Sequence, residues 1–215
     1  MLSDAAPGAR SDGSSRSYRV RVGTQQVTLP VVALGGGLSI ALLITVDQGV
    51  SFMAQAGREI AALLAPTGVE IVATAATMGL PVAIETSRSL GFDDYLVLHK
   101  TPKIHLADAL VEDVRSITTG PVQQLRLDRA RTGSVAGRRV AFVDDVVSTG
   151  SSAAAALRLL RRAGAEVVAV AALVTEAELW RTALGDDAGL VRSLGAMPVF
   201  RSGDDGALVE DWQGQ

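Results

Sequence analysis

The sequence contains no cysteine, and this absence excludes several kinds of chemistry at once. Without cysteine there is no disulfide framework, no thiolate nucleophile and no cysteine-ligated zinc or iron–sulfur site. Histidine is nearly as scarce, because His99 and His105 are its only occurrences, so a metal centre built on a histidine cluster is not expected. Hard ions held by carboxylates and phosphate oxygens, such as Mg²⁺, remain compatible with this composition.

Lysine is also rare, and the chain has no net positive charge. Only two of the 20 basic residues are lysines, Lys100 and Lys103, and they stand three positions apart. The formal net charge of −3 lacks the basic excess of proteins that coat nucleic acid, so we expect no nucleic-acid partner. This charge is compatible with binding one small anion.

The uncharged stretch 23–46 is long enough to cross a bilayer, but its composition favours another structure. Pro30 and the glycine run 35–37 would interrupt a spanning helix, so we predict two buried strands around a glycine turn and no membrane partner. The first residues lack the apolar run of a secretory signal, which predicts a cytoplasmic protein. Residues 1–17 are small and polar, and we expect a disordered tail there.

The 215 residues, 48% hydrophobic and 20% charged, suit one compact domain over 18–215. Continuous apolar runs alternate with helical spacing, which predicts an α/β fold whose parallel sheet is covered by helices on both faces. Ligands of such sheets bind at the carboxyl ends of the strands. The predicted strands are 40–46, 69–73, 95–98, 140–143 and 167–174, the predicted helices are 52–64, 79–90 and 151–163, and 18–28 is predicted to be an edge strand or hairpin.

The polar segment 101–139 is long for a connection in a compact domain, and it contains a β-like stretch at 122–127. Long connections are often lids, so we predict a mobile lid over about residues 101–121. His105, Asp108 and Glu112 lie on this segment and are candidates for contact with a substrate.

Residues 140–152, VAFVDDVVSTGSS, form the strongest motif. A buried strand delivers Asp144 and Asp145 to the sheet edge, where we expect both carboxylates to be solvated and to face hydroxyls or a divalent cation. The next turn opens a helix whose free N–H groups, dipole and neighbouring hydroxyls favour a phosphate, unless the hydroxyls only cap the helix. The predicted anion-binding residues are Val147, Ser148, Thr149, Gly150, Ser151 and Ser152.

This motif resembles the signature with which type I phosphoribosyltransferases bind 5-phosphoribosyl-1-pyrophosphate (PRPP): four apolar residues, two acidic residues and a small-residue loop with Thr-Gly. The segments GLPVAIETSRSLG and YLVLHKTPK resemble the helix and strand that lead to a pyrophosphate-side lysine in adenine phosphoribosyltransferase and its relatives. The resemblance implies a Rossmann-like central parallel sheet with a small N-terminal hood at 18–48, to which 195–212 are a further candidate contribution. It also implies displacement of pyrophosphate from PRPP by a nitrogenous base, with Mg²⁺ brought in by PRPP.

The resemblance assigns roles to particular residues. Residues 147–152 are implied to hold the 5′-phosphate, while Asp144 and Asp145 are implied to contact the ribose hydroxyls and to stabilise developing positive charge. The protein alone is implied to hold no metal, although the two aspartates are candidates for contact with Mg²⁺. His99 is interpreted as structural, because it points to the other side of its strand from Lys100. The implied pyrophosphate-binding residues are Thr74, Ala75, Ala76, Thr77, Lys100 and Lys103.

The acceptor base and the oligomeric state rest on the resemblance as well. A purine is the predicted acceptor, because the core segments most resemble adenine-type enzymes. An orotate or other pyrimidine enzyme is one alternative, and a non-catalytic regulator that senses PRPP is another. A homodimer is implied by the family, and the apolar content of 27–46 and 71–84 exceeds what one small sheet needs.

Overall fold

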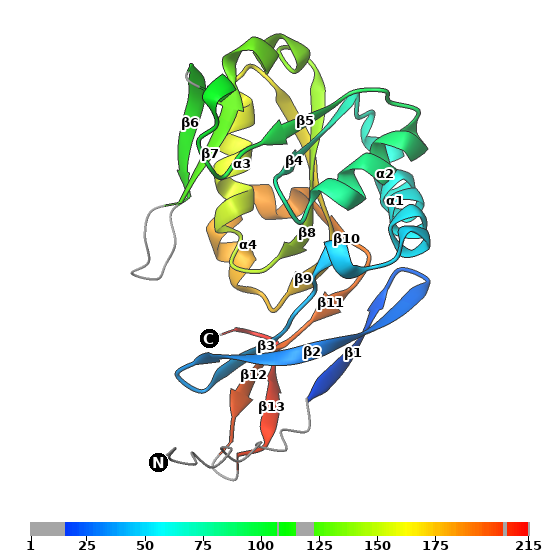
Figure 1. Ribbon diagram of the computed structural model, residues 1–215, viewed down its shortest axis with the longest axis vertical. Helices are drawn as coiled ribbons and strands as arrows, with labels where there is room; N and C mark the ends of the chain where they lie inside the picture. Colours follow the sequence, from blue (N-terminus) through cyan, green and yellow to red (C-terminus); the bar gives the residue numbers. More distant parts are fainter. Residues whose placement is uncertain (1–15, 107, 115–122, 204–205, 215) are drawn as a thin grey trace, which may run out of the picture.

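The computed structural model describes residues 16–106, 108–114, 123–203 and 206–214 of the chain. A parallel sheet forms its centre, in the order β10-β9-β8-β4-β5, with β11 also paired to β9 (Figure 1). This arrangement confirms the predicted α/β class. The strands are β4 (Ile71–Ala75), β5 (Tyr95–Leu98), β8 (Arg139–Val147), β9 (Glu166–Glu176), β10 (Val191–Ser193) and β11 (Ala196–Met197).

Helices cover both faces of the central sheet, as the alternating sequence pattern predicts. Helices α1 (Val50–Leu64) and α2 (Leu80–Leu90) lie on one face, and α3 (Ser151–Arg162) lies on the other (Figure 1). The short α4 (Leu179–Leu184) follows β9. Helix α2 ends at Gly91, whose φ of 77° suits a residue without a β-carbon. The 3₁₀ turns are η1 (Thr45–Asp47), η2 (Ala65–Thr67), η3 (Ile104–Leu106), η4 (Arg129–Ser134) and η5 (Gly185–Leu190).

Two apolar layers hold these helices to the sheet. Phe142 of β8 is fully buried in the layer beneath α3, and Val143, the next residue, is fully buried in the layer beneath α1 and α2. Burying a side chain of this size contributes roughly 1.5–3 kcal/mol. Because both faces are covered, β8 carries a continuous apolar run up to Asp144, where the run ends.

A second, antiparallel sheet lies below the central one in Figure 1, in the order β1-β2-β3-β12-β13. The predicted pair of strands around the glycine turn 35–37 is confirmed as β2 and β3, and the predicted edge hairpin as β1 and β2. The prediction that both strands are buried is wrong for β2, in which Leu29 is the one buried residue. Gly23 N donates to Leu194 O at 2.9 Å and joins the two sheets. The strands are β1 (Ser17–Val22), β2 (Gln25–Gly35), β3 (Leu38–Ala41), β12 (Val199–Ser202) and β13 (Leu208–Asp211).

Two predicted boundaries in the first part of the chain are wrong. The strand predicted over 40–46 ends at Ala41, after which the chain runs to η1 with Leu42 N donating to Pro30 O. Leu43 and Thr45 are nevertheless buried, so alternating burial in this connection imitates the pattern of a strand. Residues 1–15 of the predicted tail lie outside the described residues, but Ser17 already belongs to β1.

The polar segment 101–139 contains a β-hairpin, and only the first strand of this hairpin lies within the predicted lid at about 101–121. The second strand, β7 (Gln123–Asp128), confirms the β-like stretch, whereas β6 (Ala109–Val114) was not predicted. Glu112 accepts hydrogen bonds from Arg158 and Arg162 of α3, each at 2.7 Å, so it ties the hairpin to that helix. Asp108 pairs with Arg129 at 2.8 Å. The His105 side chain and residues 115–121 lie outside what the structure describes, and the lid remains a prediction.

Most of the apolar content of 71–84 is buried inside the chain. All five residues of β4 are buried between its neighbours, and Val82 and Ala83 of α2 are buried as well. The prediction that the apolar content of this segment exceeds what the sheet needs is therefore wrong for 71–84, in which Met78 is the one large exposed apolar side chain. In the described part of the chain, no helix combines the length and the apolar composition needed to cross a membrane.

Candidate functional site

The predicted site residues meet at the carboxyl edge of the central sheet. Strands β4, β5 and β8 run parallel in adjacent positions, so the segments that follow them emerge side by side. The Lys100 ammonium, two residues past β5, lies near enough to Asp144 on β8 to lower its pKa. Residues more than forty positions apart in the sequence therefore share one electrostatic environment.

The two aspartates occupy different environments, which corrects the expectation that both are solvated. Asp144 is 7% exposed, whereas Asp145 is half-buried, and Asp145 N donates to Asp144 Oδ1 at 3.1 Å. Burial is the largest cause that raises the pKa of Asp144 well above its ordinary value, and the neighbouring Asp145 carboxylate raises it further. Lys100 opposes both effects. At this edge, Asp144 is a carboxyl group that resists ionisation.

The loop after β4 is packed directly against Asp144. A β-carbon at Gly79 would lie 2.3 Å from Thr74 Oγ1 and 2.7 Å from Asp144 Oδ1, distances that only glycine permits. Ala76 N donates to Leu98 O at 2.9 Å, which fixes the loop to β5. Thr74 Oγ1 is buried and has no hydrogen-bond partner among the described residues. The sequence pattern indicates only that a helix starts at Gly79, and the close approach to Asp144 depends on the tertiary packing.

The loop after β8 surrounds a cavity of about 80 Å³ at the start of α3. This volume suits a small anion, since one water occupies about 30 Å³ of liquid. Helix α3 begins at Ser151, and its N-cap, Gly150, has no side chain with which to cap it. Ser151 N donates to Thr149 Oγ1 at 3.4 Å, a long bond, so the capping alternative applies to Thr149, whereas the Ser148 hydroxyl bonds elsewhere, to Glu176. The cavity is lined by Asp144, Val146, Val147, Ser148, Thr149, Gly150, Ser152 and Ala153.

Gly150 allows the loop after β8 to pack against the backbone of Trp180, a contact that the sequence pattern does not indicate. Its φ is 79°, and a β-carbon there would lie 2.9 Å from Trp180 Cα and 3.0 Å from Trp180 O. The loop thus rests on the backbone of α4. Trp180 is itself 4% exposed, and its indole Nε1 donates to Ala177 O at 3.0 Å.

Glu176, at the end of β9, is the second group that sequence analysis missed. The Ser148 hydroxyl donates to Glu176 Oε2 at 2.5 Å, and Glu176 is only 5% exposed. Burial raises the pKa of Glu176, and the hydrogen bond from Ser148 opposes that rise. The predicted strand ended at Val174. Glu176 is a carboxylate just beyond the predicted strand, at the carboxyl end where ligands of parallel sheets bind, and this position could have indicated it as a site residue.

The remaining predicted groups lie around this edge. Lys103 is exposed, and its backbone carbonyl accepts from Leu106 N at 2.9 Å. His99 exchanges two backbone hydrogen bonds with Arg126, at 2.8 and 2.9 Å, and so attaches the end of β5 to β7. These bonds use the backbone of His99, so the structural role predicted for its side chain stays a prediction.

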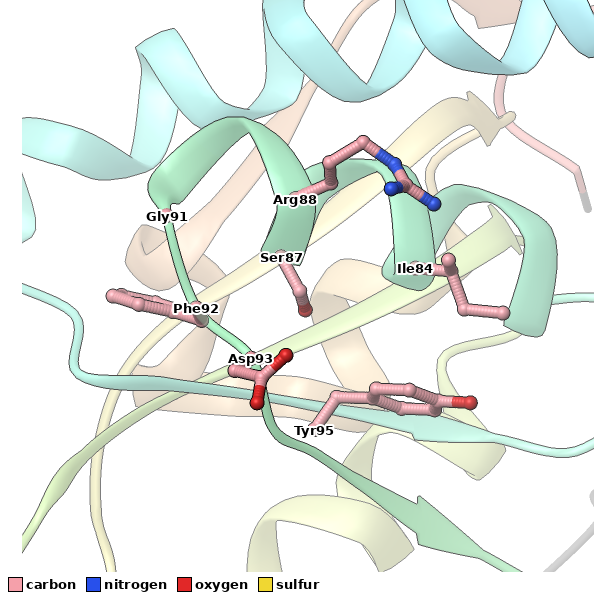
Figure 2. A pocket seen from close by; sticks show the side chains of 7 residues that line it. All are labelled: Ile84, Ser87, Arg88, Gly91, Phe92, Asp93 and Tyr95. Carbon is pink, nitrogen blue, oxygen red and sulfur yellow. The ribbon is translucent and has the colours of Figure 1, made fainter.

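A larger cavity, of about 310 Å³, lies elsewhere, between the end of α2 and the start of β5 (Figure 2). Ser87, Asp93 and Tyr95 point into the space beneath the helix. Because parallel strands start at the edge opposite their carboxyl ends, this cavity lies at the far side of the sheet from Asp144. It contains none of the predicted site residues, so volume alone does not locate the chemistry.

Comparison with known proteins agrees with this geometry. The family model for the phosphoribosyl transferase domain matches residues 53–191. The hypoxanthine/guanine phosphoribosyltransferase of Methanococcus voltae is 32% identical over 108 residues, which cover 50% of this chain and 54% of that protein. The chain spans about half or less of the length of the curated relatives it matches.

Solved structures establish the fold independently. The APRTase of Giardia lamblia, complexed with 9-deazaadenine, superposes with a TM-score of 0.63 at 18% identity, covering 78% of this chain and 93% of that one. The orotate phosphoribosyltransferase of Mycobacterium tuberculosis, in complex with inorganic phosphate, gives a TM-score of 0.55 at 24% identity, covering 78% and 82%. Because the family match spans β4, β5, β8 and both loops at the carboxyl edge, and covers more than half of the residues, this chain belongs to the phosphoribosyl transferase domain family.

Proposed function

We propose that this protein transfers a phosphoribosyl group from PRPP to a nitrogenous base, forming a nucleoside monophosphate and releasing pyrophosphate. One observation carries the proposal: the anion-sized cavity, the Asp144–Asp145 pair and Lys100 lie at the same edge of one parallel sheet. PRPP presents a phosphate, a hydroxylated ribose and a pyrophosphate in that order. A site with an anion loop, two carboxyl groups and a cation has a partner for each of them.

The loop 147–152 is proposed to hold the 5′-phosphate. The first N–H groups of α3 have no partner within the helix, and the helix dipole favours negative charge at this end. Gly150 brings the backbone close, and the Thr149 and Ser151 hydroxyls lie 3.1 Å apart beside the opening. Fixing the phosphate at this point would place the ribose next to the strand end that carries the aspartates.

Asp145 and Asp144 are proposed to act at the ribose and at the pyrophosphate loop respectively. Asp145 is half-buried and can accept hydrogen bonds from ribose hydroxyls. Asp144 contacts the loop after β4 through Gly79, so it positions the loop that is proposed to bind pyrophosphate, together with Lys100. A cation at this point favours the departing pyrophosphate, whose charge increases as the bond to ribose breaks.

Mg²⁺ fits this site as a partner of the substrate. Mg²⁺ prefers oxygen ligands, retains several waters and is commonly held by one or two carboxylates together with phosphate oxygens. Asp144 and Asp145 supply such carboxylates, and the described residues contain no group of three or more potential metal ligands. When bound, the ion would neutralise charge on the pyrophosphate oxygens.

A purine is the proposed acceptor. The relatives from Methanococcus voltae and Giardia lamblia are purine enzymes by name, although the Mycobacterium tuberculosis structure is that of an orotate enzyme. The family match covers 53–191, so β1, β2, β3, β12 and β13 fall outside it. We propose that this second sheet is the hood that selects the base.

Pyrophosphate release tests the proposal directly. The protein is incubated with PRPP and Mg²⁺ together with adenine, hypoxanthine, guanine, xanthine, orotate or uracil, and pyrophosphate is measured against a sample without base. Release with a purine supports the proposal, and release only with orotate or uracil would assign a pyrimidine enzyme. PRPP binding by calorimetry without turnover on any base would favour the PRPP-sensing regulator.

We also propose a homodimer, with the contact near the loop after β4. Val46 is 53% exposed, Val50 is 83% exposed and Met78 is 36% exposed. Thr45 donates its hydroxyl hydrogen to Met78 O at 2.5 Å, which brings these segments together. Exposed apolar side chains grouped in this way are typical of contact surfaces. A monomeric mass by light scattering at micromolar concentration would refute the dimer.

A further inference from the structure

Glu176 lies directly behind the loop 147–152 and engages one of its hydroxyls. The Ser148 hydroxyl donates to Glu176 Oε2 at 2.5 Å, and the carboxyl group is almost completely buried. A hydroxyl carries one hydrogen, and an ionised carboxylate can only accept. While Glu176 is ionised, the Ser148 hydrogen is therefore committed to it and unavailable to a ligand in the cavity.

Phosphate binding in the cavity conflicts with this arrangement. A phosphate dianion also only accepts, so it competes with Glu176 for the single Ser148 hydrogen. Two negative charges would then lie on either side of one hydroxyl oxygen in a partly buried site, where charges are weakly screened. Protonation of Glu176 removes both problems. The carboxylic acid donates to Ser148 Oγ, and the Ser148 hydrogen turns to the phosphate.

We propose that Glu176 is a positioning residue of the anion loop, and that it takes up one proton from solvent when the loop binds the 5′-phosphate. No other bond changes in this step. The inference rests on the proposed function, because it assumes that the loop is a phosphate site, and it adds control of that site by pH.

The environment of Glu176 supports proton uptake. Burial raises the pKa of Glu176, so the cost of protonating it near neutral pH is lower than for a solvated glutamate. The pKa of Glu176 responds to burial and to the hydrogen bond from Ser148, and charged groups on the neighbouring elements do not shift it. Strand β11, which pairs beside Glu176, carries no charge. These charged groups are Asp144 and Asp145 on β8, the Glu178–Arg181 pair at α4 and the Arg201–Asp211 pair of the second sheet.

The loop is held from behind at a second point as well. Gly150 lies against the Trp180 backbone, and Trp180 is tied by its indole to Ala177, the residue after Glu176. The segment 176–180 thus supports the loop at Ser148 and at Gly150. A proton on Glu176 changes the hydrogen bonding at the first point while the second keeps the loop in place.

Sulfate binding provides the test, because sulfate, unlike phosphate, keeps a constant charge between about pH 5 and about pH 9. Affinity is measured by calorimetry across this range for the full chain, Glu176→Gln and Glu166→Gln. Glu166 is exposed and lies at the opposite end of the same strand. Glu166→Gln therefore removes the same charge as Glu176→Gln without changing a contact to the loop.

We expect the affinity of the unchanged protein for sulfate to fall by up to about tenfold per pH unit above the pKa of Glu176, the slope for one linked proton. Glu176→Gln should bind sulfate more tightly than the unchanged protein at high pH, since its neutral amide can donate to Ser148. Its affinity should depend less on pH, and the dependence that remains is that of Asp144, which also lines the cavity. Glu166→Gln should retain the profile of the unchanged protein. Profiles that are the same in Glu176→Gln and the unchanged protein would overturn the inference.

Two further outcomes separate this inference from the proposed function. Ser148→Ala should lose most of the pH dependence, and a full pH dependence in that variant would refute the route through the hydroxyl. If neither sulfate nor ribose 5-phosphate binds to any variant at any pH, the loop is not a phosphate site and both proposals fail. If both ligands bind with a flat profile in the unchanged protein, the phosphate site stands and only the proton uptake is wrong.

Discussion

Replacing Asp144 with asparagine should make the protein more stable at neutral pH and at the same time strongly reduce nucleotide formation. Asp144 is 7% exposed, and its Oδ1 accepts from Asp145 N, a contact that an asparagine oxygen can also make. The pKa of Asp144 is raised first by burial and then by the Asp145 carboxylate. Asparagine keeps the shape of the side chain and removes the group that resists ionisation.

The sign of the stability change follows from the raised pKa. A carboxyl group whose pKa is higher in the folded state than in the unfolded state contributes stability that is complete below the unfolded pKa. That contribution is lost as the pH rises through the folded pKa, which for Asp144 lies above the ordinary range. At neutral pH the parent therefore bears a cost that Asp144→Asn does not.

The magnitude is large enough to measure. Each unit by which folding raises a pKa is worth about 1.4 kcal/mol. For a protein of this size, 1 kcal/mol shifts the melting temperature by about 2–4 °C. We therefore expect Asp144→Asn to melt at least about 2 °C higher than the parent at neutral pH, with the difference disappearing in acid.

Thermal unfolding from about pH 4 to about pH 8 tests this expectation. Asp145→Asn is the comparison variant, because it removes the second cause of the raised pKa of Asp144 and leaves burial, the first, in place, so its gain in melting temperature should be smaller. Pyrophosphate release by either variant should fall by about 10²–10³, the usual effect of removing a group that stabilises transition-state charge. A lower melting temperature at neutral pH, or a gain that does not vary with pH, would refute the reasoning.

Three further substitutions test the supports of the site. Gly150→Ala should destabilise the protein by about 1–2 kcal/mol in chemical denaturation and weaken sulfate binding, since a β-carbon at positive φ would collide with the Trp180 backbone; unchanged stability would refute this contact. Lys100→Ala should weaken pyrophosphate binding by calorimetry more than Lys103→Ala does, because only the first ammonium is close to Asp144; equal losses would count against that ranking. Glu112→Gln should cost no more than about 1 kcal/mol but increase hydrogen exchange in β6, and unchanged exchange would show that α3 holds this hairpin by other contacts.

The central sheet and the location of the site could be predicted from the sequence because they depend on local patterns. An apolar run that ends in Asp144 and Asp145 indicates a buried strand and its carboxyl end without any tertiary information. The same holds for the run that ends before Lys100. Parallel strands emerge at a common edge, so these two local patterns already imply one site.

Burial at that edge could not be predicted in the same way. Adjacent acids at the end of a strand have the same local sequence context, yet one is 7% exposed and the other half-buried. The difference is made by Gly79, which brings the loop after β4 onto Asp144. Which of the two aspartates the loop covers depends on the packing of β4 against β8. The residues next to the aspartates in the sequence do not indicate this packing.

The second sheet shows a similar limit at a larger scale. Strand β12 pairs with β3 although more than 150 residues separate them, and β13 pairs with β12. The register Val199–Ile40 depends on both segments reaching the same place. The family match ends at residue 191, before β12 begins. If the second sheet selects the base, specificity depends on a part of the chain that lies outside the family match. Exchanging β12 and β13 for those of a purine or an orotate enzyme should then change the accepted base without changing sulfate binding at residues 147–152. A chimera that changed sulfate affinity and kept its base preference would contradict this division of roles.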